Sequence, residues 1–223
     1  SLGLRMARRL AETLGEAGQV VVSGLARGID TEAHRAALAT GTVAVMAGGV
    51  DVIYPEENAG LLAEVAAKGC VLSEQPMGLV PQARHFPLRN RIIAALGLGT
   101  LVVEAALKSG SLITAKMALD LNREVLAIPG SIHATQSHGC HALIRQGAKL
   151  VENAQDVLEE LQLAPQQQVN LFANALVSDE ETSTDDTDHP LLIHMGFAPV
   201  SLDALQARCG LDTAALQAQL LTL

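Results

Sequence analysis

The sequence predicts an α/β fold in which a mostly parallel sheet is covered by helices on both sides, followed by a small helical domain. Short strand-like runs between residues 4 and 163 are apolar on both faces, and each is followed by a run with helical periodicity. Glycines gather where these strands end. In parallel sheets that edge is where ligands bind, so the binding edge is predicted together with the fold.

The first half of the alternation is marked by clear stops. Gly18 ends the first helix, the β-branched run after it is typical of a strand, and Gly48-Gly49 ends the second strand. In chain order, the expected helices and strands are Leu4–Gly18, Val20–Ser23, Ile29–Thr40, Thr42–Met46, Glu57–Lys68 and Cys70–Ser73.

The second half continues in the same way after a Pro-rich and Arg-rich stretch. A short helix is followed by a continuous apolar strand, and helices and strands then alternate to residue 161. In chain order, the expected elements are Asn90–Leu96, Thr100–Ala105, Ser111–Leu121, Glu124–Ile128, His141–Gln146, Lys149–Val151 and Ala154–Leu161.

Composition divides the chain into a main domain (1–163), an acidic linker (164–189) and a partial winged-helix-like domain (190–223). The linker contains a Gln run and six acids but no Lys or Arg, which is typical of a mobile segment. In the tail, Pro190–Gly196 and Ser201–Leu221 look helical, with Gly210 between two short amphipathic helices. This spacing is typical of a helix-turn-helix or winged-helix unit, here expected without its β-wing.

Net charge at first argues against nucleic acid as a partner, but its distribution does not. The 223 residues carry a formal charge of −9, of which −6 lies in the linker and only −2 in residues 1–163. Aromatic residues are too few for a multi-ring platform of the RRM or OB type, since only Tyr54, Phe86, Phe172 and Phe197 are present. A local basic site with one stacking ring, Phe86, is the form of nucleic-acid binding that remains.

Other bulk features favour a cytoplasmic protein. No apolar run approaches the roughly 18 residues of a membrane span, and the N-terminus lacks a signal-peptide pattern. The three cysteines, Cys70, Cys140 and Cys209, are odd in number and widely spaced, so no disulfide framework is expected.

The first candidate site is the segment SGLARGID at residues 23–30, which follows a strand and opens a helix. Small residues at Ser23, Gly24 and Gly28 would let backbone N–H groups approach a phosphate. The helix N-terminus adds a partial positive charge, and Arg27 could bind two phosphate oxygens. The alternative is a tight turn with a surface arginine, because a Gly-rich turn of this kind is a weak signal by itself.

The second candidate site is RHFPLRNR at residues 84–91, the most basic stretch of the chain. Arg84, Arg89 and Arg91 could each bind phosphate bidentately. Phe86 could stack on a base, and Asn90 is a further candidate contact. The alternative is that Phe86 belongs to the core and the arginines pair with acids. A ring among three arginines favours nucleic acid over a generic anion.

The third candidate site is KSGSLITAK at residues 108–116, again after an apolar strand. The turn Ser109-Gly110-Ser111 would offer hydroxyl and N–H groups to a phosphate at a helix start, with Lys116 as a further DNA-binding candidate. The spacing is not that of a Walker A motif. Capping of the helix by Ser109 or Ser111 is an alternative that is compatible with phosphate binding.

Metal chemistry is not expected. His133, His138, Cys140 and His141 have the side chains of zinc ligands, but their spacing matches no common structural site and would strain tetrahedral geometry. We therefore expect incidental histidines in a loop, and no cofactor.

Catalysis is not expected either, because neither a G-x-S-x-G segment nor an evident triad is present. Asp51 and Glu104 could form an acid–base pair at strand ends. Asp51 is better explained as organising the Gly48-Gly49 turn, and Glu104 as holding an arginine of residues 84–91.

Taken in order, these segments resemble the DNA-processing protein A family (DprA, also called Smf). The resemblance covers nearly all of residues 3–151, and the number and order of the matching pieces make it specific. The pieces are SGLARGID at 23–30 with His34, GxDxxYPxxN at 49–58, SExPxG at 73–78, FPxRNRIIA at 86–94, VVEA at 102–105, SGSLITA at 109–115, PG at 129–130 and SxGxxxLIxxGA at 137–148.

The resemblance implies an extended Rossmann-like domain that binds and protects single-stranded DNA and helps load the RecA recombinase, in many bacteria during natural transformation. It also implies a non-enzymatic role, a homodimer formed through this domain, and a C-terminal winged-helix-like domain. Family members usually begin with a strand and a Gly-Thr/Ser-Arg turn before the first helix. Since this sequence opens at Ser1-Leu2-Gly3, we expect the sheet to lack one strand and the site to lack one phosphate-binding turn.

Two other functions remain open. A nucleotide-binding hydrolase or carrier would use the same edge of a Rossmann-like sheet, and turnover of nucleoside monophosphates would favour it. A transcriptional regulator would use the C-terminal helices, and duplex affinity that is lost without residues 165–223 would favour that function.

Overall fold

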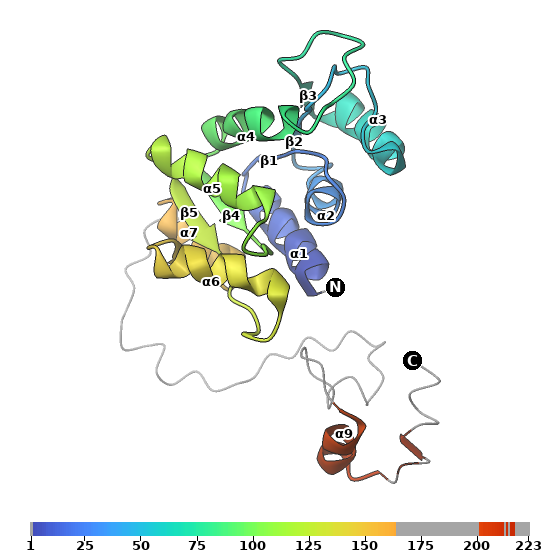
Figure 1. Ribbon diagram of the computed structural model, residues 1–223, viewed down its shortest axis with the longest axis vertical. Helices are drawn as coiled ribbons and strands as arrows, with labels where there is room; N and C mark the ends of the chain where they lie inside the picture. Colours follow the sequence, from blue (N-terminus) through green and yellow to red (C-terminus); the bar gives the residue numbers. More distant parts are fainter. Residues whose placement is uncertain (1, 164–200, 212, 214, 217–223) are drawn as a thin grey trace. The chain divides into compact units, whose positions relative to one another are not determined.

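The computed structural model describes residues 2–163, 201–211, 213, 215 and 216 (Figure 1). Contacts divide the chain into two units, residues 1–166 and 167–223. The first unit alternates helices and strands as the sequence predicts. Its elements are α1 (Leu2–Glu16), β1 (Val21–Ser23), α2 (Ile29–Ala36), β2 (Thr42–Val45), α3 (Ala59–Lys68), β3 (Cys70–Leu72), α4 (His85–Leu96), β4 (Gly99–Val102), α5 (Gly110–Asp120), β5 (Glu124–Ala127), α6 (His138–Arg145), β6 (Lys149–Leu150) and α7 (Ala154–Glu160), with short 3-10 turns η1 (Glu56–Asn58) and η2 (Thr135–Ser137).

All described strand pairs are parallel, which confirms the predicted fold class. The strands form two three-stranded sheets, in the orders β1-β2-β3 and β4-β5-β6, rather than the single sheet suggested by the sequence. In the first sheet Val22 pairs with Val43, and in the second Leu101 pairs with Leu126. Because every strand runs in the same direction within its sheet, the loops that follow neighbouring strands meet at one edge.

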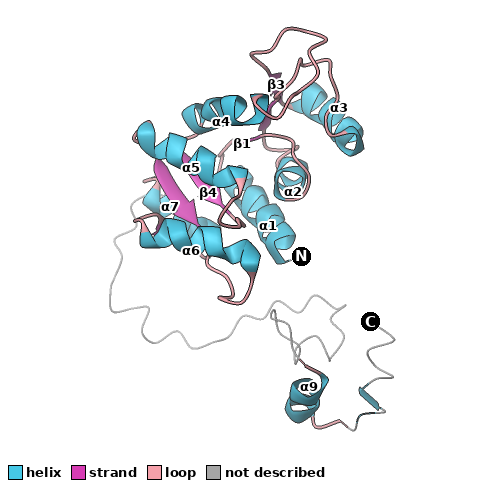
Figure 2. Ribbon diagram, viewed as in Figure 1, coloured by secondary structure: helices cyan, strands magenta, loops and turns pink. Residues whose placement is uncertain are grey.

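Helices cover both faces of the second sheet (Figure 2). On one face α4, α5 and α6 bury Ala94, Ala115 and Cys140 against the strands, and on the other face α1 and α7 bury Leu10 and Val157. The first sheet has its own core, in which α3 packs on β2 around Leu25, Ala44, Met46, Leu61, Leu62 and Val65.

The helix α4 differs most from its expected bounds, because it begins at His85 rather than at Asn90. Pro87 is only the third residue of this helix, and the first turn of a helix tolerates proline because its N–H groups have no partner within the helix. The consequence is that Arg89, like Arg91, is presented by a helix and not by a loop.

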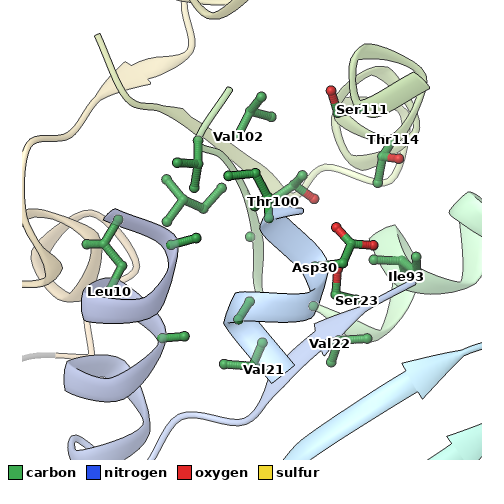
Figure 3. Close-up of a pocket in the computed structure, with 18 of the residues that line it drawn as sticks. Leu10, Val21, Val22, Ser23, Asp30, Ile93, Thr100, Val102, Ser111 and Thr114 are labelled. Atoms are coloured by element: carbon green, nitrogen blue, oxygen red, sulfur yellow. The ribbon is translucent and has the colours of Figure 1, made fainter. Parts of the chain in front are cut away.

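A cavity of about 550 Å³ lies between β1 and β4, which do not pair with each other (Figure 3). Figure 3 shows Leu10 of α1 on one side of it and Ser23, Asp30 and Ser111 on the other. The cavity therefore has an apolar part and a polar part at the carboxyl ends of the two strands. The first strand that the resemblance implies stays a prediction.

In the second unit the described residues contain the helix α9 (Leu202–Cys209). Leu205 and Leu216 are buried together, with Cys209 and Leu211 packed against them. The expected linker and the expected helix Pro190–Gly196 lie outside the described residues. None of the helices in the described parts of the chain has the length and apolar character needed to cross a bilayer.

Candidate functional site

The three segments singled out in the sequence line the same cavity, although they are far apart along the chain. The predicted site residues among the lining are Ser23 and Arg27, then Phe86, Arg89 and Asn90, and finally Ser109, Gly110 and Ser111. A neighbouring hollow of about 550 Å³ brings Arg27 and Gly28 beside Lys108 and Ser109. Of the remaining candidates, Arg84, Arg91 and Lys116 are exposed and lie outside both hollows, and Gly24 lies under the guanidinium of Arg89.

Asp30, which was not predicted as a site residue, shapes the loop after β1. Its carboxylate accepts hydrogen bonds from the N–H groups of Gly24 (3.1 Å) and Ala26 (3.2 Å). The expected cradle of free N–H groups is therefore not available at Gly24. Phosphate binding by this loop would depend on the side chain of Arg27 and on the start of α2.

Arg27 extends from this loop into solvent, with its side chain 70% exposed. Its guanidinium donates a 2.6 Å hydrogen bond to the Glu57 carboxylate. This bond and the charge of Glu57 raise the pKa of Arg27. The pKa of Glu57 is lowered by a hydrogen bond from its own backbone N–H and by the bond from Arg27. An exposed ion pair of this kind is weak, so a phosphate could replace the carboxylate.

Arg89 behaves differently, because it is only 7% exposed. Its Nη1 donates to the carbonyl oxygens of Gly24 (2.6 Å) and Val45 (2.5 Å), and its Nε donates to Asn90 (3.1 Å). Burial lowers its pKa. We therefore assign Arg89 and Gly24 to the support of the site and not to direct contact with a phosphate, contrary to the expectation from the sequence.

The other two arginines of the segment 84–91, Arg84 just before α4 and Arg91 within it, are exposed. Arg91 forms an ion pair with Glu74, as the alternative interpretation allowed, and Arg84 donates to the ring of His85 (3.4 Å). Glu104 is not among the partners of Arg84, Arg89 and Arg91, so the expected bond from Glu104 to one of these arginines is not formed. Glu104 packs instead against Gly3 at the start of α1, where a carboxylate is favoured by the helix dipole.

Phe86 is half-buried, and two groups contact its ring. The Tyr54 ring lies 5.6 Å away, centroid to centroid, at 58°, and the Arg89 guanidinium lies 5.9 Å from the Phe86 centroid. The prediction of Phe86 as the one ring at the site was therefore incomplete. In the sequence, the feature that could have pointed to Tyr54 was its position in the matching segment 49–58. Its distance from Phe86 along the chain gave no indication that the two rings meet.

The third segment caps α5. The hydroxyl of Ser109 accepts a hydrogen bond from the N–H of Ser111 (3.4 Å), and the two hydroxyls are 2.7 Å apart. Asn90 donates to the carbonyl oxygen of Gly110 (3.5 Å), so this turn is tied to α4. The start of α5 thus presents two hydroxyl groups and a partial positive charge to the cavity.

Asn58 holds the loop after β1 from the other side, and sequence reasoning did not assign it to the site. It is buried, and its side-chain amide donates to the carbonyl oxygen of Leu25 (2.9 Å) and to the hydroxyl of Thr31 (3.0 Å). Asp51 has a similar role one turn earlier, since its carboxylate accepts from the N–H of Gly78 (2.8 Å). The partner of Asp51 thus lies in the loop after β3, and the expected role of Asp51 in organising the Gly48-Gly49 turn stays a prediction.

His34 lies fully buried beneath the same loop. Its Nδ1 is 2.7 Å from the hydroxyl of Thr42, and no partner is found for its Nε2. Burial lowers the pKa of His34 to about 4, with the positive charge of Arg89 acting in the same direction and Asp30 opposing it. His34 is therefore neutral at pH 7 and serves as a core side chain.

Two of the three histidines of residues 133–141 bond to the main chain through their rings. His138 lies 3.0 Å from the carbonyl oxygen of Ile132, and His141 lies 2.9 Å from that of Gly130. Cys140 is buried against the carbonyl oxygens of Val102 and Val103, and burial raises the pKa of its thiol. Within the described residues, no group of three or more His, Cys, Asp or Glu side chains could hold a metal ion.

The family profile described as DNA recombination-mediator protein A matches residues 1–162, the part that carries the whole of this site. The chain belongs to this family. A second profile, the DprA winged helix domain, matches residues 178–223, so the chain ends in a winged helix domain, as predicted.

Several DprA and Smf proteins are similar to this chain. Protein Smf of Escherichia coli is 41% identical over 99% of this chain and 60% of its own length. DNA processing protein DprA of Streptococcus pneumoniae is 53% identical over 64% of this chain and 51% of its own length, and that of Bacillus subtilis is 47% identical over 71% and 54%. The chain thus spans little more than half the length of these curated relatives.

Two solved DprA structures have the same fold. The X-ray structure of S. pneumoniae DprA superposes with a TM-score of 0.67 at 48% identity, covering 72% of this chain and 57% of that one. The structure of Helicobacter pylori DprA, described for its single-stranded DNA binding mode, gives a TM-score of 0.67 at 30% identity, covering 72% of this chain and 74% of that one.

Proposed function

We propose that this chain is a recombination mediator that binds and protects single-stranded DNA and helps load RecA onto it, as in natural transformation. The observation that carries the proposal is the meeting of three segments at one sheet edge, with Arg27 exposed beside the capped start of α5. The family description and the DNA-binding mode reported for the H. pylori relative support it.

The proposed contacts differ in kind. Arg27, Arg84 and Arg91 are exposed and would bind phosphates, since each can exchange its present partner. Ser109 and Ser111 would bind a phosphate at the start of α5. Ser23, Gly28, Phe86, Asn90 and Lys116 complete the proposed DNA-binding set, and Gly24 and Arg89 support it.

The proposal is non-enzymatic, and it includes a homodimer. Binding, orientation and release of a strand need only cations, hydroxyls and rings, which this edge supplies. Sedimentation velocity of the purified chain across concentrations would test the dimer. RecA loading would be tested by the rate of RecA filament growth on single strands coated with a single-strand binding protein, with and without this chain.

The test of the DNA site is a salt series with matched arginine variants. The double variant Arg27→Ala/Arg84→Ala should weaken binding to oligo-dT and lower the slope of log K against log salt by about 0.7 for each phosphate contact removed. Arg123→Ala is the control, because Arg123 is exposed just before β5, at the opposite edge of the sheet. Equal affinity and slope for both variants would overturn the site assignment, and preference for duplex DNA would favour a transcriptional regulator.

A nucleotide carrier or hydrolase is the second candidate, and the volume of the cavity favours it. At about 550 Å³ the cavity has the size of a small-molecule site. Saturable binding or turnover of a nucleoside monophosphate, with no affinity for oligo-dT, would establish that function instead.

A further inference from the structure

Tyr54 is an exposed aromatic residue in a firmly anchored segment. Tyr54 is 49% exposed and lies in the stretch between β2 and η1. Before it, Asp51 is bonded to Gly78, and after it Asn58 is bonded to Leu25. Anchors on both sides hold the ring near one position, which lowers the entropy lost when a ligand stacks on it.

The ring of Tyr54 has a neighbour that fixes it further. It packs against Phe86 at 5.6 Å and 58°, a tilted arrangement that is favourable for aromatic pairs. Phe86 is also covered by the guanidinium of Arg89, 5.9 Å from the ring centroid. Since Phe86 is half-buried between these neighbours, the more accessible ring of the pair is Tyr54.

One proposed phosphate-binding side chain, Arg27, lies near the Tyr54 ring. Glu57, three residues after Tyr54, holds Arg27 at 2.6 Å, and the Tyr54 phenol adds to the rise in the pKa of Arg27 that Glu57 causes. The three side chains thus form one cluster. A strand whose phosphate replaced Glu57 at Arg27 would bring its bases within reach of the Tyr54 ring.

We propose that Tyr54 stacks on a base of the bound single strand, with Phe86 supporting it from behind as the second ring of a two-ring platform. The inference rests on the proposed function and names the residue that recognises the base. Stacking on a ring tolerates any base, so the contact adds affinity for single strands without adding sequence specificity.

The composition of the chain permits a direct measurement. Tyr54 is the only tyrosine, and the chain has no tryptophan, so tyrosine emission reports this one ring. Oligo-dT should quench the emission as it binds, with absorption by DNA corrected by a parallel titration of a free tyrosine derivative. An abasic oligomer of equal length, which offers phosphates without bases, should bind less tightly and leave the emission unchanged.

Two variants and a control complete the experiment. Tyr54→Leu should weaken oligo-dT binding about fivefold or more, measured by anisotropy of a labelled strand, and Tyr54→Phe should stay within about twofold of the unmodified chain. Leu119→Ala, which removes another exposed apolar side chain on α5, should have no effect. Circular dichroism would check that each variant is folded.

The outcomes separate this inference from the proposed function. Tight binding without quenching, together with full affinity in Tyr54→Leu, would overturn the role of Tyr54 and leave DNA binding intact. Absence of oligo-dT binding by the unmodified chain would overturn both.

Discussion

The guanidinium of Arg89 on α4 donates a 2.6 Å hydrogen bond to the carbonyl oxygen of Gly24, directly after β1. A second bond reaches Val45 at the end of β2, so one side chain joins α4 to two strands of the first sheet. A methyl group added at Gly24 would overlap this guanidinium. Arg89, an arginine of the basic segment 84–91, therefore uses its guanidinium to stabilise the fold.

Replacing Arg89 should thus alter stability more than DNA electrostatics. Arg89→Met keeps much of the side-chain length but leaves the buried Val45 carbonyl oxygen and the partly buried Gly24 carbonyl oxygen without this donor. The loss should cost about 1–3 kcal/mol of unfolding free energy in urea denaturation. The salt slope of oligo-dT binding should not change in the folded variant. A slope lowered by about 0.7 at unchanged stability would instead identify Arg89 as a phosphate contact.

Glu57 competes with phosphate for Arg27, so its removal should strengthen DNA binding. In Glu57→Gln the charge that holds Arg27 is lost, and oligo-dT affinity should rise by about two- to fivefold at low salt and less at high salt. Anisotropy of a labelled strand measures this directly.

The effect should depend on Arg27 itself. In an Arg27→Ala background, Glu57→Gln should produce a smaller gain, so a double-mutant cycle isolates the pair from general charge effects. Glu160→Gln is a matched control, because Glu160 also pairs with a surface cation, Lys149, but on α7. An equal gain from both single variants would show that only net charge matters.

The alternation of strands and helices was predictable, because burial on both faces makes the strands uniformly apolar and the helices periodic. The start of α4 was not, because Pro87 argues locally against a helix and only its place in the first turn makes it acceptable. The ends of the strands could not be predicted either, because they are set by tertiary contacts. β4 stops at Val102, and the N–H of Ala105 bonds to Gln136, a partner about thirty residues away.

Residue types identified the candidate site, but they did not show which of its residues are exposed to a ligand and which support the fold. Arg27 and Arg89 look equivalent in the sequence, yet one is exposed and the other buried, and only their partners in the fold decide this. From the sequence, Asp30 is expected only as a residue in the first turn of a helix. Its role as acceptor for the N–H groups of Gly24 and Ala26 depends on the left-handed backbone at Leu25. Pairings between distant segments, such as Tyr54 with Phe86, leave no periodic trace in one sequence.

Asn58 should be sensitive to the direction of its hydrogen bonds. Asn58→Ala removes the donor to Leu25 and Thr31 and should cost about 1–3 kcal/mol. Asn58→Asp has the same shape but faces the Leu25 carbonyl with an acceptor, so it should be more destabilising than alanine. Urea denaturation at pH 7 compares the two, and the reverse order of stability would contradict the assigned orientation of the amide.

His34 should make the fold sensitive to acid. Its pKa is about 4 in the folded chain and 6.5 as the ordinary value, so between these limits the unfolded chain binds more protons and stability falls as the pH is lowered. The loss from this one residue should approach about 3 kcal/mol once the pH reaches the folded value. In His34→Gln, which does not titrate, the decline in unfolding free energy between pH 6.5 and pH 4 should be smaller by a similar amount. His133→Gln, at an exposed loop position, should retain the decline of the unmodified chain, and an equal change in both variants would show that burial of His34 is not the cause.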